Sequence, residues 1–347
     1  MRRTTLGNTD INVSAFCLGT MTFGSNTAEV EAYRQLDASL EFGIDFLDSA
    51  EMYPVNPVSK DTIGNTEAII GRWNAKSGRR KDYVIATKCA GENRSFVREN
   101  QLVDSKAIRK ACEGSLRRLQ TDYIDLYQLH WPNRSSYHFR QIWGYDPSNQ
   151  DRENTIQNFD DVMGELSLLV EEGKIRAFGL SNETAWGTMQ WLAAAERKQG
   201  PRIASIQNEY SLLCRMPYDA DMAELGHNEN ITLLAFSPLA TGFITGKYLD
   251  GALPEGSRHH IAGGSPRSSP RLDAAVRAVL GIAEKHGVDP VHMAISFCLQ
   301  RPFPCIPIVG ATTLSQLEHI AAGSDVVLSA EVISDLSTAN RANPMPF

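Results

Sequence analysis

Residues 105–130 read SKAIRKACEGSLRRLQTDYIDLYQLH and combine a helical pattern with a strand-like run. In residues 105–119, apolar side chains recur at the three- and four-residue spacing of one helix face. Residues 123–130 form a short apolar run that is typical of a buried strand and that ends on His130. A helix followed so closely by a strand is half of a β–α–β unit, which favours an α/β fold.

The same alternation of strand-like runs and helical patterns extends along the whole chain. Strands are expected at 15–20, 44–49, 83–89, 123–130, 175–181, 203–207, 231–237 and 305–310. Helices are expected at 28–42, 66–77, 105–119, 155–172, 183–198, 219–227, 272–286 and 314–322. Eight strand–helix units in series predict parallel strands that close into an α/β (β/α)8 TIM barrel. An open, doubly wound sheet is the alternative architecture.

Two further elements lie outside the repeating units. Residues 4–7 and 11–14, joined by a short polar turn, predict an N-terminal β-hairpin. Residues 330–339 predict an extra C-terminal helix. No linker separates one part of the chain from another, so residues 1–347 are expected to form a single domain.

The composition excludes several classes of partner. The chain has 347 residues, of which 42% are hydrophobic and 22% charged, as in ordinary globular proteins. A net charge of −7 without a basic stripe argues against binding to nucleic acid or to an anionic membrane surface. No signal peptide and no apolar run long enough for a membrane span is recognised. The six cysteines are scattered without paired spacing, so reduced thiols and a cytoplasmic location are expected.

Four polar residues stand at or just beyond the ends of predicted strands: Asp48, Tyr53, Lys88 and His130. The carboxyl ends of parallel strands meet on one face, where α/β enzymes build their active sites. Each residue alone has an ordinary explanation, such as an ion pair or a satisfied core histidine. Together they predict a proton-transfer site.

The four side chains suit the protonation of a carbonyl oxygen. A tyrosine phenol has an ordinary pKa of about 10, and a nearby ammonium such as that of Lys88 is expected to lower it. Asp48 would hold Lys88 by a charge-assisted hydrogen bond, and His130 would orient a substrate oxygen or share the proton.

Two other enzyme classes fit the same residues less well. Lys88 could form a Schiff base, but Tyr53 and Gln207 would then have no role. His130 could bind a catalytic metal together with carboxylates, but no second strand-end histidine accompanies it. No metal site is therefore expected.

Three connections are longer than a barrel needs: 54–65, 131–154 and 239–270. All three leave strand ends on the face of the four polar residues, and long loops inside a compact domain are usually functional. The second begins at Trp131 and is rich in aromatic residues, which predicts a pocket for a flat or apolar aldehyde. Arg134 and Arg140 would equally favour acids, and a packed surface loop is the structural alternative. The physiological substrate stays open.

Several motifs resemble those of the aldo-keto reductases. They are GTMTFG at 19–24, DSAEMY at 48–53, ATK at 86–88, LRRLQTDYIDLYQLH at 116–130, GKIR at 173–176 and GLSN at 179–182. The chain is most similar to the bacterial Tas-like branch and resembles the potassium-channel β subunits as well. The resemblance runs from residue 4 to residue 323.

This resemblance implies a barrel that binds NADPH, with NADH less favoured, and that has no Rossmann fingerprint. It implies hydride transfer from the nicotinamide C4 to an aldehyde or ketone carbon. Tyr53 would be the general acid, Lys88 and Asp48 its tuning pair, and His130 the residue that orients the carbonyl. Tyr53, His130 and Trp131 would contact the substrate.

The resemblance also implies a set of cofactor-binding residues. Those around the nicotinamide would be Thr20, Met21, Asp48, Ser181, Asn182, Gln207 and Phe236. Those on the loop over the pyrophosphate would be Ser237, Pro238, Leu239, Gly242, Lys247 and Arg258. Those at the helix start beside the adenosine phosphate would be Gly310, Thr312 and Gln316.

The chain departs from the family pattern at four of these positions or their neighbours. Phe236 stands where tyrosine or tryptophan is usual, which keeps a stacking face and loses a polar group. Gln316 stands where others carry arginine, and His319 and Ile320 replace a common Glu-Asn pair. The strength of the preference for NADPH therefore stays open.

A second functional class also stays open. The similarity to channel β subunits suggests a regulatory subunit that senses NADP(H) and turns over slowly. Fast oxidation of NADPH with small aldehydes would favour the enzyme, whereas tight cofactor binding with negligible turnover would favour the sensor. A homo-oligomer is possible in either class.

Overall fold

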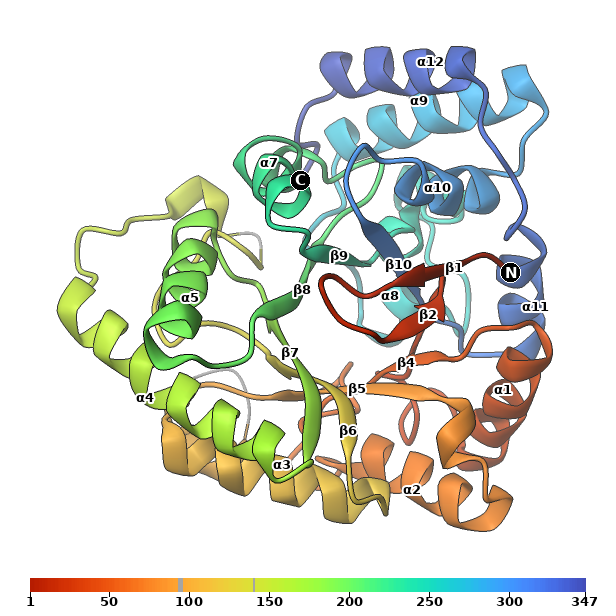
Figure 1. Cartoon of the computed structure of the whole chain (residues 1–347). Coiled ribbons are helices and arrows are strands. Elements are labelled where there is room, and N and C mark those ends of the chain that lie inside the picture. The colour runs from red at the N-terminus through yellow and green to blue at the C-terminus, as the bar shows by residue number, and fades with distance from the viewer. Residues whose placement is uncertain (93–95, 140) are drawn as a thin grey trace.

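The computed structural model describes residues 1–92, 96–139 and 141–347, and within them eight parallel strands form a closed barrel (Figure 1). The strands are β3 (Cys17–Gly19), β4 (Phe46–Asp48), β5 (Val84–Cys89), β6 (Ile124–Leu129), β7 (Ile175–Ser181), β8 (Ile203–Glu209), β9 (Thr232–Phe236) and β10 (Cys305–Val309). β10 pairs with both β3 and β9, which closes the ring. The predicted (β/α)8 barrel is confirmed, and the open sheet is excluded.

Helices surround the barrel (Figure 1). They are α1 (Glu29–Glu41), α2 (Asn65–Ser77), α3 (Ser105–Leu119), α4 (Arg152–Glu171), α5 (Ala185–Lys198), α6 (Met216–Asp219), α7 (Asp221–Asn228), α8 (Arg258–Ile261), α9 (Pro270–His286), α10 (Pro290–Leu299), α11 (Leu314–Ala322) and α12 (Ala330–Ala342). The predicted C-terminal helix is α12, which packs beside α9. No helix in the described part of the chain is both long and apolar enough to span a bilayer.

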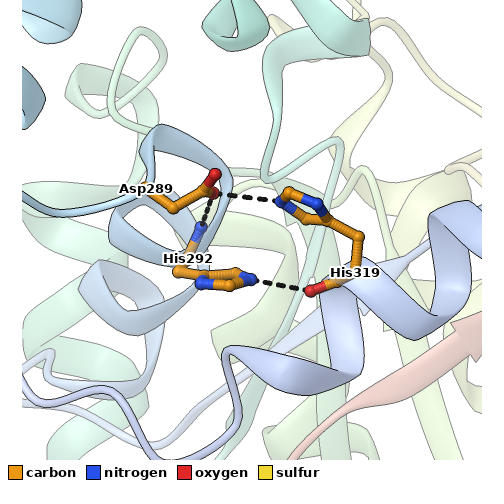
Figure 2. Close-up of side chains that lie close together, drawn as sticks. All are labelled: Asp289, His292 and His319. Carbon is orange, nitrogen blue, oxygen red and sulfur yellow. Dashed lines mark hydrogen bonds and ion pairs between the residues drawn. The ribbon is translucent and has the colours of Figure 1, made fainter.

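The sequence analysis missed helix α10. Its signal is at the N-terminus, where Asp289 Oδ1 accepts hydrogen bonds from the backbone N–H groups of Val291 and His292 and Pro290 occupies the first turn. Figure 2 shows the hydrogen bond between His292 and Asp289. The helix itself is so apolar that it has no polar face, because six of its ten residues are buried. A run of this kind lacks the amphipathic period from which the longer helices were predicted, and the short helices α6 and α8 were missed as well.

The N-terminal hairpin closes the amino end of the barrel. β1 (Arg3–Thr5) and β2 (Asn12–Ser14) pair antiparallel, as predicted, and the hairpin residues Leu6, Ile11 and Val13 pack on the barrel interior. At Gly7 the backbone has φ +52° and an added Cβ would lie 2.3 Å from the carbonyl oxygen of Ala204. Only glycine allows the turn to approach the strands this closely.

The barrel interior is built in two layers. Side chains two positions apart on a strand point to the same side, so each strand places one residue in each layer. The lower, apolar layer touches the hairpin and contains Phe46, Ala86, Leu126 and Ala177. Two positions further along the same strands stand Asp48, Lys88, Gln128 and Gly179. On these four strands the second layer is mostly polar, whereas β9 and β10 place Phe236 and Ile308 at the same step. This layer lies directly beneath the carboxyl ends of the strands.

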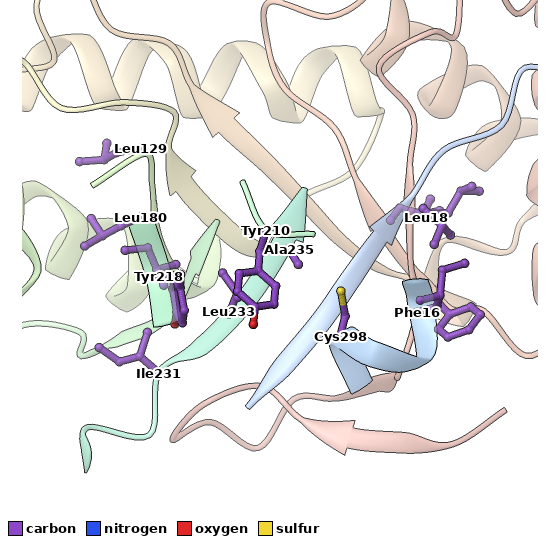
Figure 3. Close-up of a cluster of buried hydrophobic side chains, with 14 of the residues drawn as sticks. Phe16, Leu18, Leu129, Leu180, Tyr210, Tyr218, Ile231, Leu233, Ala235 and Cys298 are labelled. Atoms are coloured by element: carbon purple, nitrogen blue, oxygen red, sulfur yellow. The ribbon is translucent and has the colours of Figure 1, made fainter. Parts of the chain in front are cut away.

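The outward faces of the strands pack against the helices. Figure 3 shows part of this layer, in which Leu129, Leu180 and Leu233 project from the barrel. Because helices cover the outside and side chains fill the inside, every residue of β6 is buried. Burial of each such leucine stabilises the fold by about 1.5–3 kcal/mol. The barrel is therefore a stiff frame for the polar layer.

Candidate active site

A cavity of about 960 Å³ opens at the carboxyl ends of the barrel strands. Most of the residues singled out from the sequence line it: Met21, Asp48, Tyr53, His130, Trp131, Ser181, Asn182, Gln207, Phe236, Ser237, Pro238, Leu239, Gly242, Lys247, Arg258, Gly310, Thr312 and Gln316. Thr20 and Lys88 do not line it. Thr20 is buried and binds the carbonyl oxygen of Asp48 through both its hydroxyl and its N–H. Thr20 therefore holds the backbone of Asp48 in place and does not contact the cavity.

Lys88 lies fully buried beneath the cavity floor and uses all three of its ammonium protons. Nζ donates to Asp48 Oδ2 at 2.6 Å, to the carbonyl oxygen of Ser49 at 2.8 Å and to the phenol oxygen of Tyr53 at 3.3 Å. Burial lowers the pKa of Lys88, but the charges of Asp48 and Tyr53 and their hydrogen bonds outweigh it, so the pKa is raised. Lys88 is therefore a charged ammonium with no donor left for another group.

The hydroxyl of Tyr53, unlike the Lys88 ammonium, keeps an unused hydrogen-bond donor. Its oxygen accepts a hydrogen bond from Lys88, and no described residue accepts its own hydroxyl proton. Burial raises the pKa of Tyr53 more than the Lys88 charge lowers it. Lys88 thus lowers the pKa as expected, but desolvation of the phenolate is the larger effect, so the pKa of Tyr53 is raised overall. Tyr53 is a neutral phenol that lines the cavity, and its hydroxyl proton has no acceptor among the described residues.

Asp48 is held on both oxygens. Oδ2 accepts from Lys88, and Oδ1 accepts from Gln207 Nε2 at 2.8 Å and from Gln128 Nε2 at 3.3 Å. Its side chain is only 4% exposed. A buried carboxylate with three donors is fixed in position and stabilised in its charged form.

His130 faces Tyr53 across the cavity floor. The two rings lie 5.7 Å apart in an edge-on arrangement. Burial, with the nearby charge of Lys88, holds the pKa of His130 well below its ordinary value, so the imidazole is neutral. Nδ1 is buried and has no hydrogen-bond partner among the described residues. Because His130 lines the cavity, this neutral ring can exchange a hydrogen bond with a bound molecule without carrying a charge itself.

Two amide side chains of residues that line the cavity use their nitrogen atoms fully. Asn182 Nδ2 donates to the carbonyl oxygen of His130 and to Ser181 Oγ, at 2.9 and 3.0 Å. Gln207 Nε2 donates to Asp48 Oδ1 and to Gln128 Oε1. Because both amide nitrogens are fully used, each side chain has only its oxygen left. Asn182 Oδ1 is buried without a partner among the described residues.

An aromatic wall rises from His130 along one side of the cavity. His130 packs on Trp131, Trp131 on Phe139 and Phe139 on Phe236, with ring centroids 4.8, 6.2 and 6.4 Å apart. Arg134, considered from the sequence as an acid-binding group, instead pairs with Glu183 and contacts Thr184. Arg140 lies outside the described residues. The wall near Tyr53 is therefore apolar.

The far end of the cavity lies between α10 and the start of α11. His319 Nε2 lies 3.2 Å from Asp289 Oδ1, and His292 Nε2 is 2.7 Å from the carbonyl oxygen of His319 (Figure 2). Since Asp289 also caps α10, these polar groups already have partners. Gln316 Oε1 accepts from both the N–H and the hydroxyl of Thr312. Gln316 thus shapes the loop before α11 rather than extending a free side chain.

Gln128, Glu209 and Arg267 are among the residues of the site that were missed in the sequence, and all three are buried. Gln128 was read as part of an apolar strand, although a glutamine within such a run is itself a signal of a buried polar contact. Glu209 and Arg267 form a bidentate pair, with distances of 2.6 and 2.8 Å, and both line the cavity. No sequence spacing joins these two residues, because Glu209 ends β8 and Arg267 lies on the third long loop.

The resemblance noted in the sequence is confirmed by comparison with known proteins. The family model described as aldo/keto reductase matches residues 15–341. Protein tas of Escherichia coli is 40% identical over 343 residues, which cover 98% of this chain and 97% of that protein. Aldo-keto reductase YhdN of Bacillus subtilis is 29% identical over 348 residues, covering 97% of this chain and 93% of that protein.

A third relative carries a different name. A probable voltage-gated potassium channel subunit beta of Arabidopsis thaliana is 28% identical over 339 residues, covering 94% of this chain and 92% of that protein. The family match nonetheless spans the whole barrel, and the fold is the one the motifs imply. The chain therefore belongs to the aldo-keto reductase family, which supports its reading as an oxidoreductase that reduces carbonyl groups.

Proposed function

We propose that this chain is an NADPH-dependent reductase that converts an aldehyde or ketone to an alcohol, with Tyr53 as the general acid. One observation carries the proposal. Lys88 has committed all three of its protons, so the hydroxyl proton of Tyr53 is the one proton of this pair that is free to enter the cavity. A neutral phenol held by a neighbouring ammonium can donate that proton to a carbonyl oxygen and leave a stabilised phenolate.

The site's donors and acceptors fit a nicotinamide cofactor. Asn182 and Gln207 offer only acceptor oxygens, and the NH₂ group of a carboxamide is a matching double donor. Lys247 and Arg258 line the same cavity and supply positive charge for phosphates. When bound, the cofactor supplies hydride to the carbonyl carbon.

The remaining residues orient the substrate and exclude water from it. His130 is neutral, so it can donate a hydrogen bond to the substrate oxygen without competing with Tyr53 as an acid. Trp131 and Phe139 cover the reacting oxygen from one side and reduce its access to water. Asp48 keeps Lys88 charged, and Lys88 in turn favours the phenolate that proton transfer leaves behind.

The test combines binding and turnover. Fluorescence titration with NADPH and NADH should give saturable binding that is tighter for NADPH, and a panel of aldehydes and ketones should oxidise NADPH. Tyr53→Phe should lower turnover by about 10²–10⁴-fold, the usual contribution of a general acid, and leave the Kd for NADPH within a few-fold. Unchanged turnover in this variant would remove Tyr53 from the role of acid.

The relative named as a channel β subunit favours one alternative, a slow NADP(H)-sensing regulatory subunit. A complete proton-donor site is compatible with both the enzyme and the sensor, so the rate of turnover distinguishes the two. Turnover faster than about 1 s⁻¹ with any simple aldehyde supports the enzyme, because that is the lower end of ordinary kcat values. Tight NADPH binding with far slower turnover across the panel supports the sensor.

A further inference from the structure

Gln128 occupies the centre of the polar layer without reaching the cavity. It lies on β6, is fully buried, and pairs in register with Lys88 on one side and Gly179 on the other. A Cβ on Gly179 would stand 3.2 Å from Gln128 Cγ and 2.5 Å from Ser205 Oγ. Glycine at this point therefore leaves the space that the long glutamine side chain fills.

The amide of Gln128 joins two residues of the proposed mechanism. Its Nε2 donates to Asp48 Oδ1 at 3.3 Å, and its Oε1 accepts from Gln207 Nε2 at 3.3 Å. Gln207 Nε2 also donates to the same Asp48 oxygen at 2.8 Å. The three side chains thus form a closed triangle in which each hydrogen bond fixes the other two.

We propose that Gln128 is a positioning residue that couples the cofactor-facing amide to the acid. By accepting from Gln207 Nε2, it keeps the nitrogen of Gln207 inward and its oxygen toward the cavity. By donating to Asp48 Oδ1, it stabilises the carboxylate whose other oxygen holds Lys88, and through Lys88 it acts on Tyr53. The inference rests on the proposed function, because it assigns Gln128 a role in that same site.

A merely structural glutamine would behave differently. If Gln128 only satisfied buried polar groups, its loss would lower stability without altering cofactor affinity or the pH profile. Loss of a positioning residue has to change both the cofactor affinity and the pH profile, since the residue acts through Gln207 and through Asp48. Gln128→Met keeps the length of the side chain and removes both hydrogen bonds, and Gln128→Glu keeps the acceptor and removes the donor.

Gln128→Met is expected to raise the Kd for NADPH about tenfold, measured by fluorescence titration of the folded protein. The effect on the Kd should be non-additive with that of Gln207→Met, because both substitutions remove the same hydrogen bond between Gln207 and Gln128. Ser205→Ala is the matched control. It is equally buried, and Ser205 Oγ has no hydrogen-bond partner among the described residues, so its Kd should stay within twofold of that of the unmodified protein.

The pH dependence of turnover in Gln128→Glu distinguishes a positioning role from a loss of stability. A glutamate here is buried beside Asp48, and both effects raise its pKa, while the Lys88 ammonium on the neighbouring strand opposes them. Once protonated, it can again donate to Asp48 and accept from Gln207, so turnover should recover as the pH falls. The unmodified protein should not show this acid-side gain.

The outcomes separate the two proposals. If the unmodified protein neither binds NADPH nor reduces carbonyls, the proposed function fails. If it does both, and Gln128→Met has an unchanged Kd or adds fully to Gln207→Met, the role of Gln128 is overturned. Absence of acid-side recovery in a folded Gln128→Glu variant overturns it as well, and near-ultraviolet circular dichroism establishes that the variant is folded.

Discussion

The ammonium of Lys88 lies 3.3 Å from the phenol oxygen of Tyr53, and both side chains are buried. Two opposing effects act on the phenol there. Burial disfavours the phenolate and raises the pKa of Tyr53, while the positive charge lowers it. Because burial is the larger effect, the pKa of Tyr53 is raised and the phenol keeps its proton, as the proposed general acid requires.

Lys88→Met should test the role of the charge. Without the ammonium, the largest effect that offsets burial is lost, so the pKa of Tyr53 rises further and turnover should fall at least about a hundredfold. The same change leaves Asp48 charged, buried and unpaired, which should destabilise the fold by about 3–5 kcal/mol in urea unfolding. The two effects need to be separated.

The double variant Asp48→Asn with Lys88→Met separates them. It removes both charges, so most of the lost free energy of unfolding should return, while turnover stays low. A double variant that regains turnover along with stability would contradict the charge argument. The barrel frame around the pair is unchanged in either case, which circular dichroism can verify.

Phe236→Ala should weaken the binding of NADPH, because it removes the stacking face at the end of β9. The expected increase in Kd is about two- to twelvefold, corresponding to an aromatic contact of about 0.5–1.5 kcal/mol. Phe139→Ala is the comparison, since Phe139 packs between Phe236 and Trp131 on the aromatic wall. It should raise the KM for aromatic aldehydes more than it changes the Kd for NADPH. Equal Kd values for Phe236→Ala and the unmodified protein would count against stacking.

His138 should make the stability of the fold depend on pH. Burial lowers its pKa from 6.5 to about 4, and its Nε2 lies 3.2 Å from Asn208 Nδ2. The folded state therefore binds this proton less readily than the unfolded state. The stabilisation is complete above pH 6.5 and is lost as the pH falls from 6.5 toward 4, by about 3 kcal/mol.

His138→Gln provides the measurement. Glutamine can accept from Asn208 and does not titrate, so urea unfolding between pH 7 and pH 4 should show a shallower loss than the unmodified protein. His130, whose pKa is also lowered by burial, remains in both proteins and contributes equally. Parallel curves for the two proteins would show that His138 does not titrate in this range.

The barrel and most of the cavity could be predicted from the sequence because both depend on local patterns. Strand ends such as Asp48 and Lys88 are visible where an apolar run stops, and parallel topology brings them to one face. Helix α10 lacked the amphipathic period, and Gln128 was hidden inside an apolar run. Thr20 sits at a strand end as expected, but its side chain turns to the backbone of Asp48.

What the sequence could not give is the balance of competing effects and the pairing of distant residues. The direction of the pKa shift of Tyr53 depends on burial, which no motif reports. Arg134 carried a charge suited to acid binding, yet Glu183, 49 residues away, takes up that charge. Such pairings arise from tertiary packing, so they follow from coordinates alone.

Glu209 and Arg267 illustrate such a pairing and yield the last prediction. The side chains are only 8% and 7% exposed and join β8 to the 239–270 loop that covers part of the cavity. The Arg267 guanidinium also stacks over the ring of Phe347 at 4.3 Å. Arg267→Met leaves a buried carboxylate unpaired and should lower the free energy of unfolding by about 3–5 kcal/mol.

Adding Glu209→Gln to Arg267→Met removes the unpaired charge and should restore most of that stability, as measured by urea unfolding. The loop would still lack its bidentate link to β8, so the double variant should release NADPH faster in stopped-flow fluorescence, with the association rate nearly unchanged. Glu209→Gln alone keeps one hydrogen bond to Arg267. Its rate of NADPH release should lie between those of the unmodified protein and the double variant. If the double variant is as unstable as Arg267→Met, the loss comes from packing against Phe347 rather than from the buried charge.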